Sequence, residues 1–407
     1  MDIASIVLMF MGMLLFAVVL APLAQKLHLP YSLVLVLGGF VGSELVTMAG
    51  VDLGLRWQHF HQLVFYVFLP ALVFESALHM DGRSLWRNLL AILLMSTPMM
   101  LLAASITSFL LYYGIGYPAY FPLLAAFLTG ALLSATDPAA VLDLFRSSGV
   151  SERLILLVDG ESLFNDATAI VLFTLLSGLL LMATDTLTAD VVLQRFLMIF
   201  FGGMLVGCGV SALLGLLYRL FSTPFTRILI TLIAAYGSYL LAEAVLHVSG
   251  VMAVLVSGLI FGELQRRFAD RDNDQLGAVW AFNGELANAL IFLLLGVTVT
   301  WTMFEQQWLA MLIGIGAILI SRAAAMTVFM PLVALLPGEK MGWRHSLVIY
   351  WGGVRGAVTV ALALSLPLEV ESWFTIQSIA YGVVLFTLIV QAPTTPWLIR
   401  KLKLAGN

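Results

Sequence analysis

The 407-residue chain is 61% hydrophobic and only 10% charged, and its mean hydropathy is +1.04. Because about a quarter of the residues in a soluble domain are charged, this composition excludes an ordinary soluble protein and indicates a polytopic membrane protein in a lipid bilayer. The net charge of −4 says little about partners, since in a membrane protein the distribution of charge matters more than its sum. A single cysteine excludes a disulfide framework, and we expect no nucleic-acid partner.

Apolar runs of about 20 residues, the length that crosses a bilayer, recur along the whole chain. Polar residues and Gly or Pro divide them into thirteen predicted helices, so the expected fold class is an all-α polytopic membrane protein. The predicted spans are 3–25, 31–50, 61–79, 88–113, 121–145, 154–182, 191–217, 226–247, 250–264, 276–300, 308–335, 345–367 and 373–399.

The basic residues predict the topology. Fifteen of the 19 Lys and Arg fall in alternate loops, and the positive-inside rule therefore places the N-terminus outside and the C-terminus in the cytoplasm. We expect the membrane to be a bacterial cytoplasmic membrane. Two of the four exceptions, Arg322 and Arg355, fall inside predicted spans and are candidate partners for buried acids. No loop is long enough for a soluble domain, so a cytoplasmic regulatory subunit would be a separate chain. No phosphate-binding Gly-x-x-x-x-Gly-Lys loop is present, so any energy that the protein requires would come from an ion gradient and not directly from a nucleotide.

The fifth predicted span is interrupted by Ser134-Ala135-Thr136-Asp137-Pro138. Pro138 has no N–H and restricts the residue before it, so the helix should kink or unwind here. Unwound backbone at membrane depth is tolerated only where protein or water meets the freed groups, and its carbonyl oxygens can then serve as ligands. An ordinary proline kink is the alternative, but Asp137 at the break favours a functional site.

The sixth predicted span contains Gly160-Glu161-Ser162-Leu163-Phe164-Asn165-Asp166. A carboxylate near the middle of a membrane helix costs roughly 2.5–3.5 kcal/mol, which is seldom tolerated without a function. Helical spacing places Ser162 and Asp166 on one face, with Glu161 and Asn165 one step around. Oxygen groups without Cys or His suit hard cations and protons.

The twelfth predicted span is interrupted in the same way by Trp351-Gly352-Gly353-Val354-Arg355-Gly356-Ala357-Val358. Paired breaks at corresponding positions of two halves are typical of inverted-repeat transporters. Asp137 and Arg355 have the signs needed to compensate the partial charges of two crossing helix ends.

Together, Thr136-Asp137-Pro138, the segment 160–166 and Gly352-Gly353-Val354-Arg355-Gly356-Ala357 resemble the NhaP/NHE branch of the sodium/proton antiporters, over essentially the whole chain. The resemblance implies a homodimer in which a core domain moves in elevator fashion against a dimerisation domain. It assigns 1–79 and 226–300 to the dimerisation domain, 88–182 and 308–399 to the core, and 191–217 to a linker helix.

The resemblance also implies roles for individual residues. Asp166 would bind the cation or proton, and Ser162 and Thr136 would supply further oxygens to Na⁺. Asp137, Glu161 and Asn165 complete the predicted ion-binding and proton-binding group, and Arg322, Arg355 and Glu75 compensate charge. In this pattern Glu161 pairs with Arg322, Asn165 orients the unwound region, and Glu75 faces it. The Asn-Asp order resembles the electroneutral branch, whereas Asp159 is less typical and receives no transport role.

Weaker candidates have structural alternatives. Glu285 and Asn288 can border the ion pathway or form a buried hydrogen bond, and Glu243 and His247 are better explained as solvated helix-end residues than as funnel lining. No histidine spacing is typical of a metal site, and we expect no cofactor.

These observations predict exchange of a monovalent cation, Na⁺ or Li⁺, for a proton by alternating access. Proton and cation would compete for the oxygens of Asp166. A K⁺/H⁺ exchanger on the same scaffold is the nearest alternative. A channel-like permease would lack obligatory counter-transport, and a signalling subunit would tolerate Asp166→Asn. We do not expect an enzyme, because Ser162 lacks a catalytic base.

Overall fold

The computed structural model describes residues 3–27, 29–48, 62–116, 121–138, 141, 142, 145, 150–182, 189–268, 275–337, 341–370, 372–402 and 404. Over these residues the chain is predominantly helical, and no strand occurs among them. Eight of the described helical stretches are long and apolar enough to cross a membrane. The structure therefore confirms an all-α membrane protein. The count of thirteen spans stays a prediction, because several predicted spans correspond to two or more shorter helical segments.

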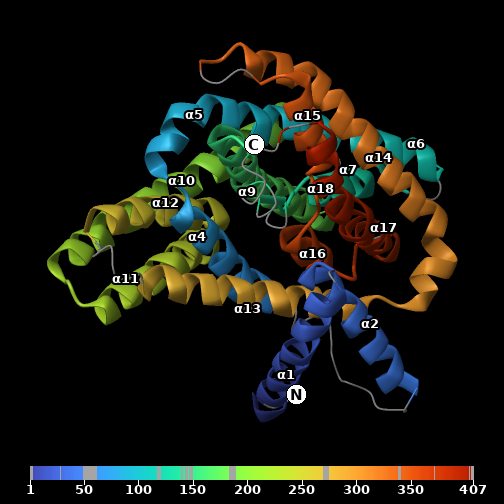
Figure 1. Ribbon diagram of the computed structural model, residues 1–407, viewed down its shortest axis with the longest axis horizontal. Helices are drawn as coiled ribbons and strands as arrows, with labels where there is room; N and C mark the ends of the chain where they lie inside the picture. The colour runs from blue at the N-terminus through green and yellow to red at the C-terminus, as the bar shows by residue number, and fades with distance from the viewer. Residues whose placement is uncertain are drawn as a thin grey trace.

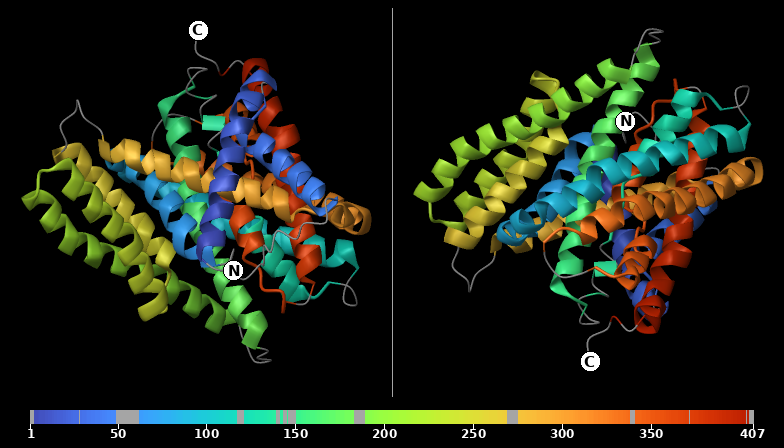
Figure 2. Two further views of the ribbon diagram at one scale, coloured as in Figure 1. Left: turned by 90° about the horizontal axis from the view of Figure 1, so that it is seen from below. Right: turned by 90° about the horizontal axis from the view of Figure 1, so that it is seen from above.

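One set of helices, which we call the scaffold group, packs around α12 and α13. Its members are α1 (Ile3–Leu27), α2 (Tyr31–Met48), η1 (Val64–Phe68) with α4 (Leu69–His79), α10 (Ala189–Leu220), α11 (Pro224–Leu240) with η3 (Leu241–Val245), α12 (Gly250–Phe268) and α13 (Gln275–Thr298). α13 packs on α2 and α4, while α12 packs on α4, α10 and α11. Figures 1 and 2 show α10, α11 and α12 side by side at one edge of the molecule.

The remaining helices form a second set, the core group. Its members are α5 (Gly82–Leu94), η2 (Met95–Met99), α6 (Met100–Ile115), α7 (Leu123–Leu132), α9 (Glu152–Met182), α14 (Trp301–Ala334), α15 (Trp343–Trp351), α16 (Ala357–Leu364), α17 (Trp373–Phe386), η4 (Thr387–Gln391) and α18 (Ala392–Lys401). α14 packs on α6 and α17, and α7 packs on both α6 and α9. In Figure 1 α6, α14 and α17 lie on the side of the molecule opposite α11.

Two predicted helix starts, at residues 88 and 308, were wrong by about two turns. α5 begins at Gly82 and α14 at Trp301. The residues that extend both helices beyond the apolar runs include polar ones, such as Arg83 in α5 and Glu305 in α14. A prediction that follows only the apolar run misses such turns, since a helix can extend beyond the hydrocarbon region.

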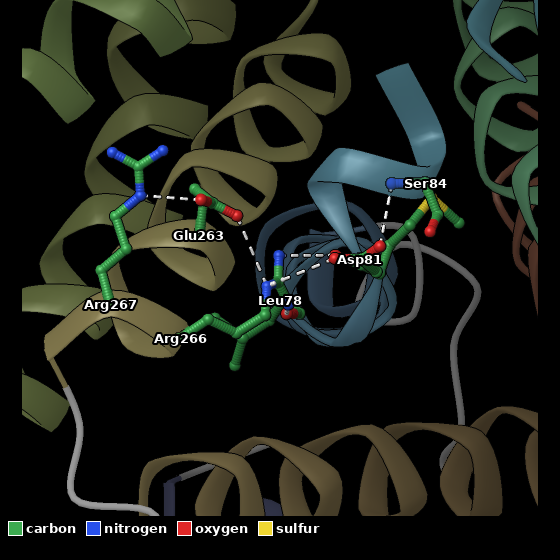
Figure 3. A network of polar contacts seen from close by, with 7 residues as sticks. Leu78, Asp81, Ser84, Glu263, Arg266 and Arg267 are labelled. Carbon is green, nitrogen blue, oxygen red and sulfur yellow. Dashed lines mark hydrogen bonds and ion pairs between the residues drawn. The ribbon is translucent and has the colours of Figure 1, made fainter. Parts of the chain in front are cut away.

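The chain passes from the scaffold group to the core group at Met80 and Asp81. Asp81 caps α5 by accepting a 2.8 Å hydrogen bond from the Ser84 N–H. Arg266, near the end of α12, donates to the Met80 carbonyl at 2.7 Å, and its Nε lies 4.0 Å from the Asp81 carboxylate (Figure 3). Hydrogen bonds from the Ser84 hydroxyl and N–H, aided by Arg266, hold the pKa of Asp81 below its usual range against a smaller effect of burial. The α4–α5 junction is thus fixed to α12.

The two predicted helix breaks are both present. α7 ends at Leu132, and Ser134 to Pro138 are not helical. α15 ends at Trp351, and α16 begins only at Ala357. The two non-helical segments lie next to each other within the core group, where they form the site described below.

Candidate functional site

The two interrupted segments are joined by hydrogen bonds. The Asp137 N–H donates to the Val354 carbonyl at 2.7 Å. The Arg355 guanidinium donates to the carbonyls of Ser134 and Ala135, at 2.7 and 2.9 Å. These carbonyls follow the C-terminal end of α7, which carries partial negative charge. Arg355 is buried, so the carbonyls of Ser134 and Ala135 compensate its charge away from water.

Asp137 occupies the complementary position at the other break. Its side chain lies against Gly356, directly before the partly positive N-terminal end of α16, and a Cβ at Gly356 would collide with it. Thr359 of α16 donates a further hydrogen bond to the Ala135 carbonyl at 3.2 Å. The two breaks therefore hold opposite charges at opposite helix ends, in contact through backbone and side chains.

α9 binds the unwound segment 133–138 with two polar side chains. The Ser162 hydroxyl donates to the Thr136 carbonyl. The Asn165 amide donates to the Ser134 carbonyl at 2.9 Å and to the Thr136 hydroxyl at 3.2 Å. Ser162 and Asn165 are buried and lie three residues apart on α9, so α9 holds the backbone of Ser134 and Thr136, which lies beyond the end of α7.

Asp166 lies one turn after Ser162 on α9. Its Oδ1 atom is enclosed and has no hydrogen-bond partner among the described residues. The Thr136 backbone, the Asp137 carboxylate and the Arg355 guanidinium are close enough to act on it electrostatically. Asp166 lines a cavity of about 130 Å³, which has room for several water molecules. The polar residues of this cavity are Glu75, Ser76, Asp137, Asp159, Ser162, Asp166 and Asn288.

Glu161 lies elsewhere on α9 and pairs with Arg322 of α14. The Arg322 Nη2 and Glu161 Oε1 atoms are 3.1 Å apart, and Arg322 also donates to the Ile349 carbonyl at 3.1 Å. Glu161 does not line the cavity of Asp166. It lines a separate cavity of about 20 Å³ with Asn165, Arg322 and Arg355. The structure thus brings together most of the predicted site residues but separates Glu161 from Asp166.

The other candidates lie as follows. Glu75 lines the cavity of Asp166, and its carboxylate is 3.2 Å from Nδ1 of His79. Asn288 lines the same cavity and also a neighbouring one of about 410 Å³, which Glu285 lines as well. Glu243 accepts a 2.9 Å hydrogen bond from the Gly250 N–H at the start of α12, so its contact is structural.

Two threonines that the sequence analysis did not single out support Arg355. Thr359 shares the Ala135 carbonyl with Arg355, and the Thr387 hydroxyl accepts a 3.2 Å hydrogen bond from the Arg355 N–H. Isolated threonines are common in membrane helices, so the sequence offered no distinguishing signal. Within the described ranges, no group of three or more His, Cys, Asp or Glu side chains is arranged to hold a metal ion.

Comparison with known proteins places the chain in a family. Residues 13–401 match the model of the sodium/hydrogen exchanger, transmembrane. The Na⁺/H⁺ antiporter ApNhaP of Aphanothece halophytica is 35% identical over 93% of this chain and 71% of its own length. The low-affinity Na⁺/H⁺ antiporter NhaS1 of Synechocystis is 35% identical over 95% of this chain and 72% of its own. The fold is similar to that of the sodium proton antiporter MjNhaP1 from Methanocaldococcus jannaschii, with a TM-score of 0.80 at 22% identity over 97% of this chain and 99% of that one. The chain therefore belongs to the sodium/hydrogen exchanger family, as its three motifs predicted.

Proposed function

We propose that this protein exchanges Na⁺ or Li⁺ for protons, with Asp166 as the group that cation and proton share. The observation that carries the proposal is the enclosed, unpartnered Oδ1 of Asp166 beside a small polar cavity. A carboxylate oxygen without a protein donor is available to a proton or to a cation, but each excludes the other. Relatives named as Na⁺/H⁺ antiporters support sodium as the cation.

Two neighbouring groups are suited to complete a cation site. The Ser162 hydroxyl donates its only hydrogen to the Thr136 carbonyl, so the lone pairs of the hydroxyl oxygen remain available to a cation. Thr136 lies in unwound backbone, and its carbonyl oxygen, which accepts one hydrogen bond from Ser162, has a second lone pair to offer a cation. Asp166, Ser162 and Thr136 together offer the oxygen donors that a hard monovalent cation prefers, and Asp137 adds negative charge next to them.

The exchange is proposed to be electroneutral. Asn165 has no titratable group and uses its amide hydrogens on Ser134 and Thr136. The Arg322 guanidinium, 3.1 Å away, favours the charged form of Glu161, and we propose that Asp166 alone alternates between cation and proton. A membrane potential acts on net transferred charge at roughly 2.3 kcal/mol per elementary charge per 100 mV. A potassium/valinomycin potential of either sign should therefore leave the sodium-driven pH equilibrium in proteoliposomes unchanged, and a voltage-dependent shift would require a second proton carrier.

The packing supports an elevator mechanism. We assign the scaffold group to the dimerisation domain (1–79 and 226–300) of a homodimer and the core group to the moving domain (88–182 and 308–399). α10, which covers the predicted linker 191–217, packs mainly on α11 and α12 and so belongs with the scaffold. Two broken helices in contact support inverted repeats within thirteen spans. The topology we propose has the N-terminus outside and the C-terminus in the cytoplasm.

The decisive test is Asp166→Asn in proteoliposomes, measured with a pH-sensitive dye inside. The amide preserves shape but removes both the titratable proton and the counter-charge, so exchange should be abolished while folding is retained. Glu305→Gln, which neutralises an exposed carboxylate on α14, is the matched control and should remain active. Persistent exchange by Asp166→Asn would refute the assignment. Adding Na⁺, Li⁺ and K⁺ separately identifies the cation, and a response to K⁺ alone would favour the K⁺/H⁺ alternative.

A further inference from the structure

The cavity of Asp166 has a larger neighbour near the N-terminal end of α9. This second cavity has a volume of about 680 Å³ and lies among the ends of α4, α5 and α9. Its polar lining residues are His79, Asp81, Ser84, Arg87, Asn88, Glu152, Arg153 and Asp159. Of the described residues, Asp159 alone lines both this cavity and the cavity of Asp166. Asp159 therefore stands at the connection between the two.

The geometry of α9 places Asp159 in line with the ion site. Asp159 precedes Asp166 by seven residues, so both lie on one helical face about 10 Å apart along the axis. Ser162 lies between them on the same face and lines the Asp166 cavity. Asp159 is half-buried, whereas Glu152 at the start of the helix is exposed. Oxygen-bearing side chains thus lead from the larger cavity to Asp166.

α4 borders the same two cavities from the other side. Glu75 lines the Asp166 cavity, and His79, one turn later, lines the larger one. Their side chains are 3.2 Å apart, so they form a pair that spans the connection. The larger cavity also carries Arg87 and Arg153. Arg153 donates hydrogen bonds to the Asn88 side chain at 3.1 Å and to the Pro337 carbonyl at 3.2 Å.

A cation that moves from the larger cavity to the smaller one gives up part of its hydration. A negative charge at the connection offsets this loss and raises the local cation concentration, since a cleft with low-dielectric walls focuses its field. We propose that Asp159 is the entry residue for the transported cation. Its carboxylate binds the cation transiently as the cation passes from the larger cavity to Asp166. The inference rests on the proposed exchange at Asp166.

The experiment compares Asp159→Asn, Asp159→Glu and Glu152→Gln with the unmodified protein in inverted and right-side-out membrane vesicles. Sodium-driven exchange by Asp159→Asn should show an apparent KM for Na⁺ raised about tenfold, with kcat nearly unchanged. The rise should be larger when Na⁺ is offered at the membrane face where α9 begins. Asp159→Glu should restore the original KM. Glu152→Gln, which removes a carboxylate from the larger cavity only, should leave it unchanged.

Two results would overturn the role of Asp159. One is an unchanged KM in Asp159→Asn at both faces. The other is an equal fall of kcat at both faces together with a lower melting temperature, which would assign the residue to structure. If Asp166→Asn is inactive in the same vesicles, either result leaves the proposed exchange intact. If Asp166→Asn still exchanges, the proposed function fails and this inference fails with it.

Discussion

Removal of either member of the Glu161–Arg322 ion pair should destabilise the protein by roughly 3–5 kcal/mol. The charged atoms are 3.1 Å apart, and the side chains of Arg322 and Glu161 are only 12% and 3% exposed. With charge centres about 4 Å apart, their attraction is about 4 kcal/mol at an effective dielectric constant of 20. Ala at either position loses this attraction and leaves the other charge buried alone, which typically costs about 3–5 kcal/mol. The double substitution should recover part of that loss.

A second Arg–Glu pair in the same chain provides a matched control. Arg267 and Glu263 on α12 lie closer, at 2.7 Å, but their side chains are 64% and 36% exposed. Exposed pairs are screened by water and contribute about 0.2–1 kcal/mol. The coupling energy should therefore be severalfold larger for the buried pair, although a comparison of distances alone would predict the opposite order.

Both coupling energies can be measured by SDS unfolding in mixed micelles, with the two single Ala variants and the double variant of each pair. Arg322→Ala should be the most destabilising single change, because it also removes the hydrogen bond to the Ile349 carbonyl. A coupling energy below about 1 kcal/mol for Glu161 and Arg322 would refute the reasoning, because it would mean that the two buried charges do not stabilise each other.

Three further changes test other parts of the structure. Asp81→Ala should cost about 1 kcal/mol of unfolding free energy by removing the cap of α5, while Asp81→Asn keeps the cap. Because the folded pKa of Asp81 is lowered, its charge stabilises the fold above the unfolded pKa of about 3.9 and ceases to do so as the pH falls through the folded pKa. Thermal melts of wild type and Asp81→Asn should therefore converge in acid, and melting temperatures that stay equally far apart would contradict this. Gly356→Ala should displace Asp137, lower exchange and reduce the free energy of unfolding by about 1–3 kcal/mol. Gly178→Ala on α9, where a Cβ meets open space, should change neither exchange nor stability. Equal melting temperatures for the two variants would count against the close contact between Gly356 and Asp137. Cysteine cross-links between two copies through α11 or α12 should preserve exchange, and cross-links through α7 or α9 that also preserve it would argue against a moving core.

The polar motifs were predictable because each is costly in a membrane helix regardless of its surroundings. Pro138 cannot donate a hydrogen bond, and Arg355 and Asp166 are charged within apolar runs, so the sequence alone marks these positions. The breaks of α7 and of α15–α16 follow from the same local chemistry. Local cost, and not knowledge of the contacts, is what made these features visible.

The contacts themselves depend on the assembled fold. Arg355 binds carbonyls that precede it by 220 and 221 residues, and no local pattern specifies that these helix ends meet. Arg266 likewise reaches Met80 from another helix. Asp159 received no role because an acid at its position is less typical of the family pattern, and its place between two cavities exists only once α4 and α5 pack near α9.

The distribution of contacts in the candidate ion site bears on how that site can move. The hydrogen bonds of Arg355, Ser162 and Asn165 join α9, the segment 133–138 and the break before α16, all within the core group. The cavity wall that the scaffold group contributes includes Glu75 of α4 and Asn288 of α13. A mechanism that moved α7 alone would break the bonds from Arg355, and hydrogen bonds to a charged group are worth about 1.5–3 kcal/mol each. A rigid movement of the whole core group past α4 and α13 would keep them all and exchange only the scaffold side of the cavity, which is why the elevator mechanism is the one we propose.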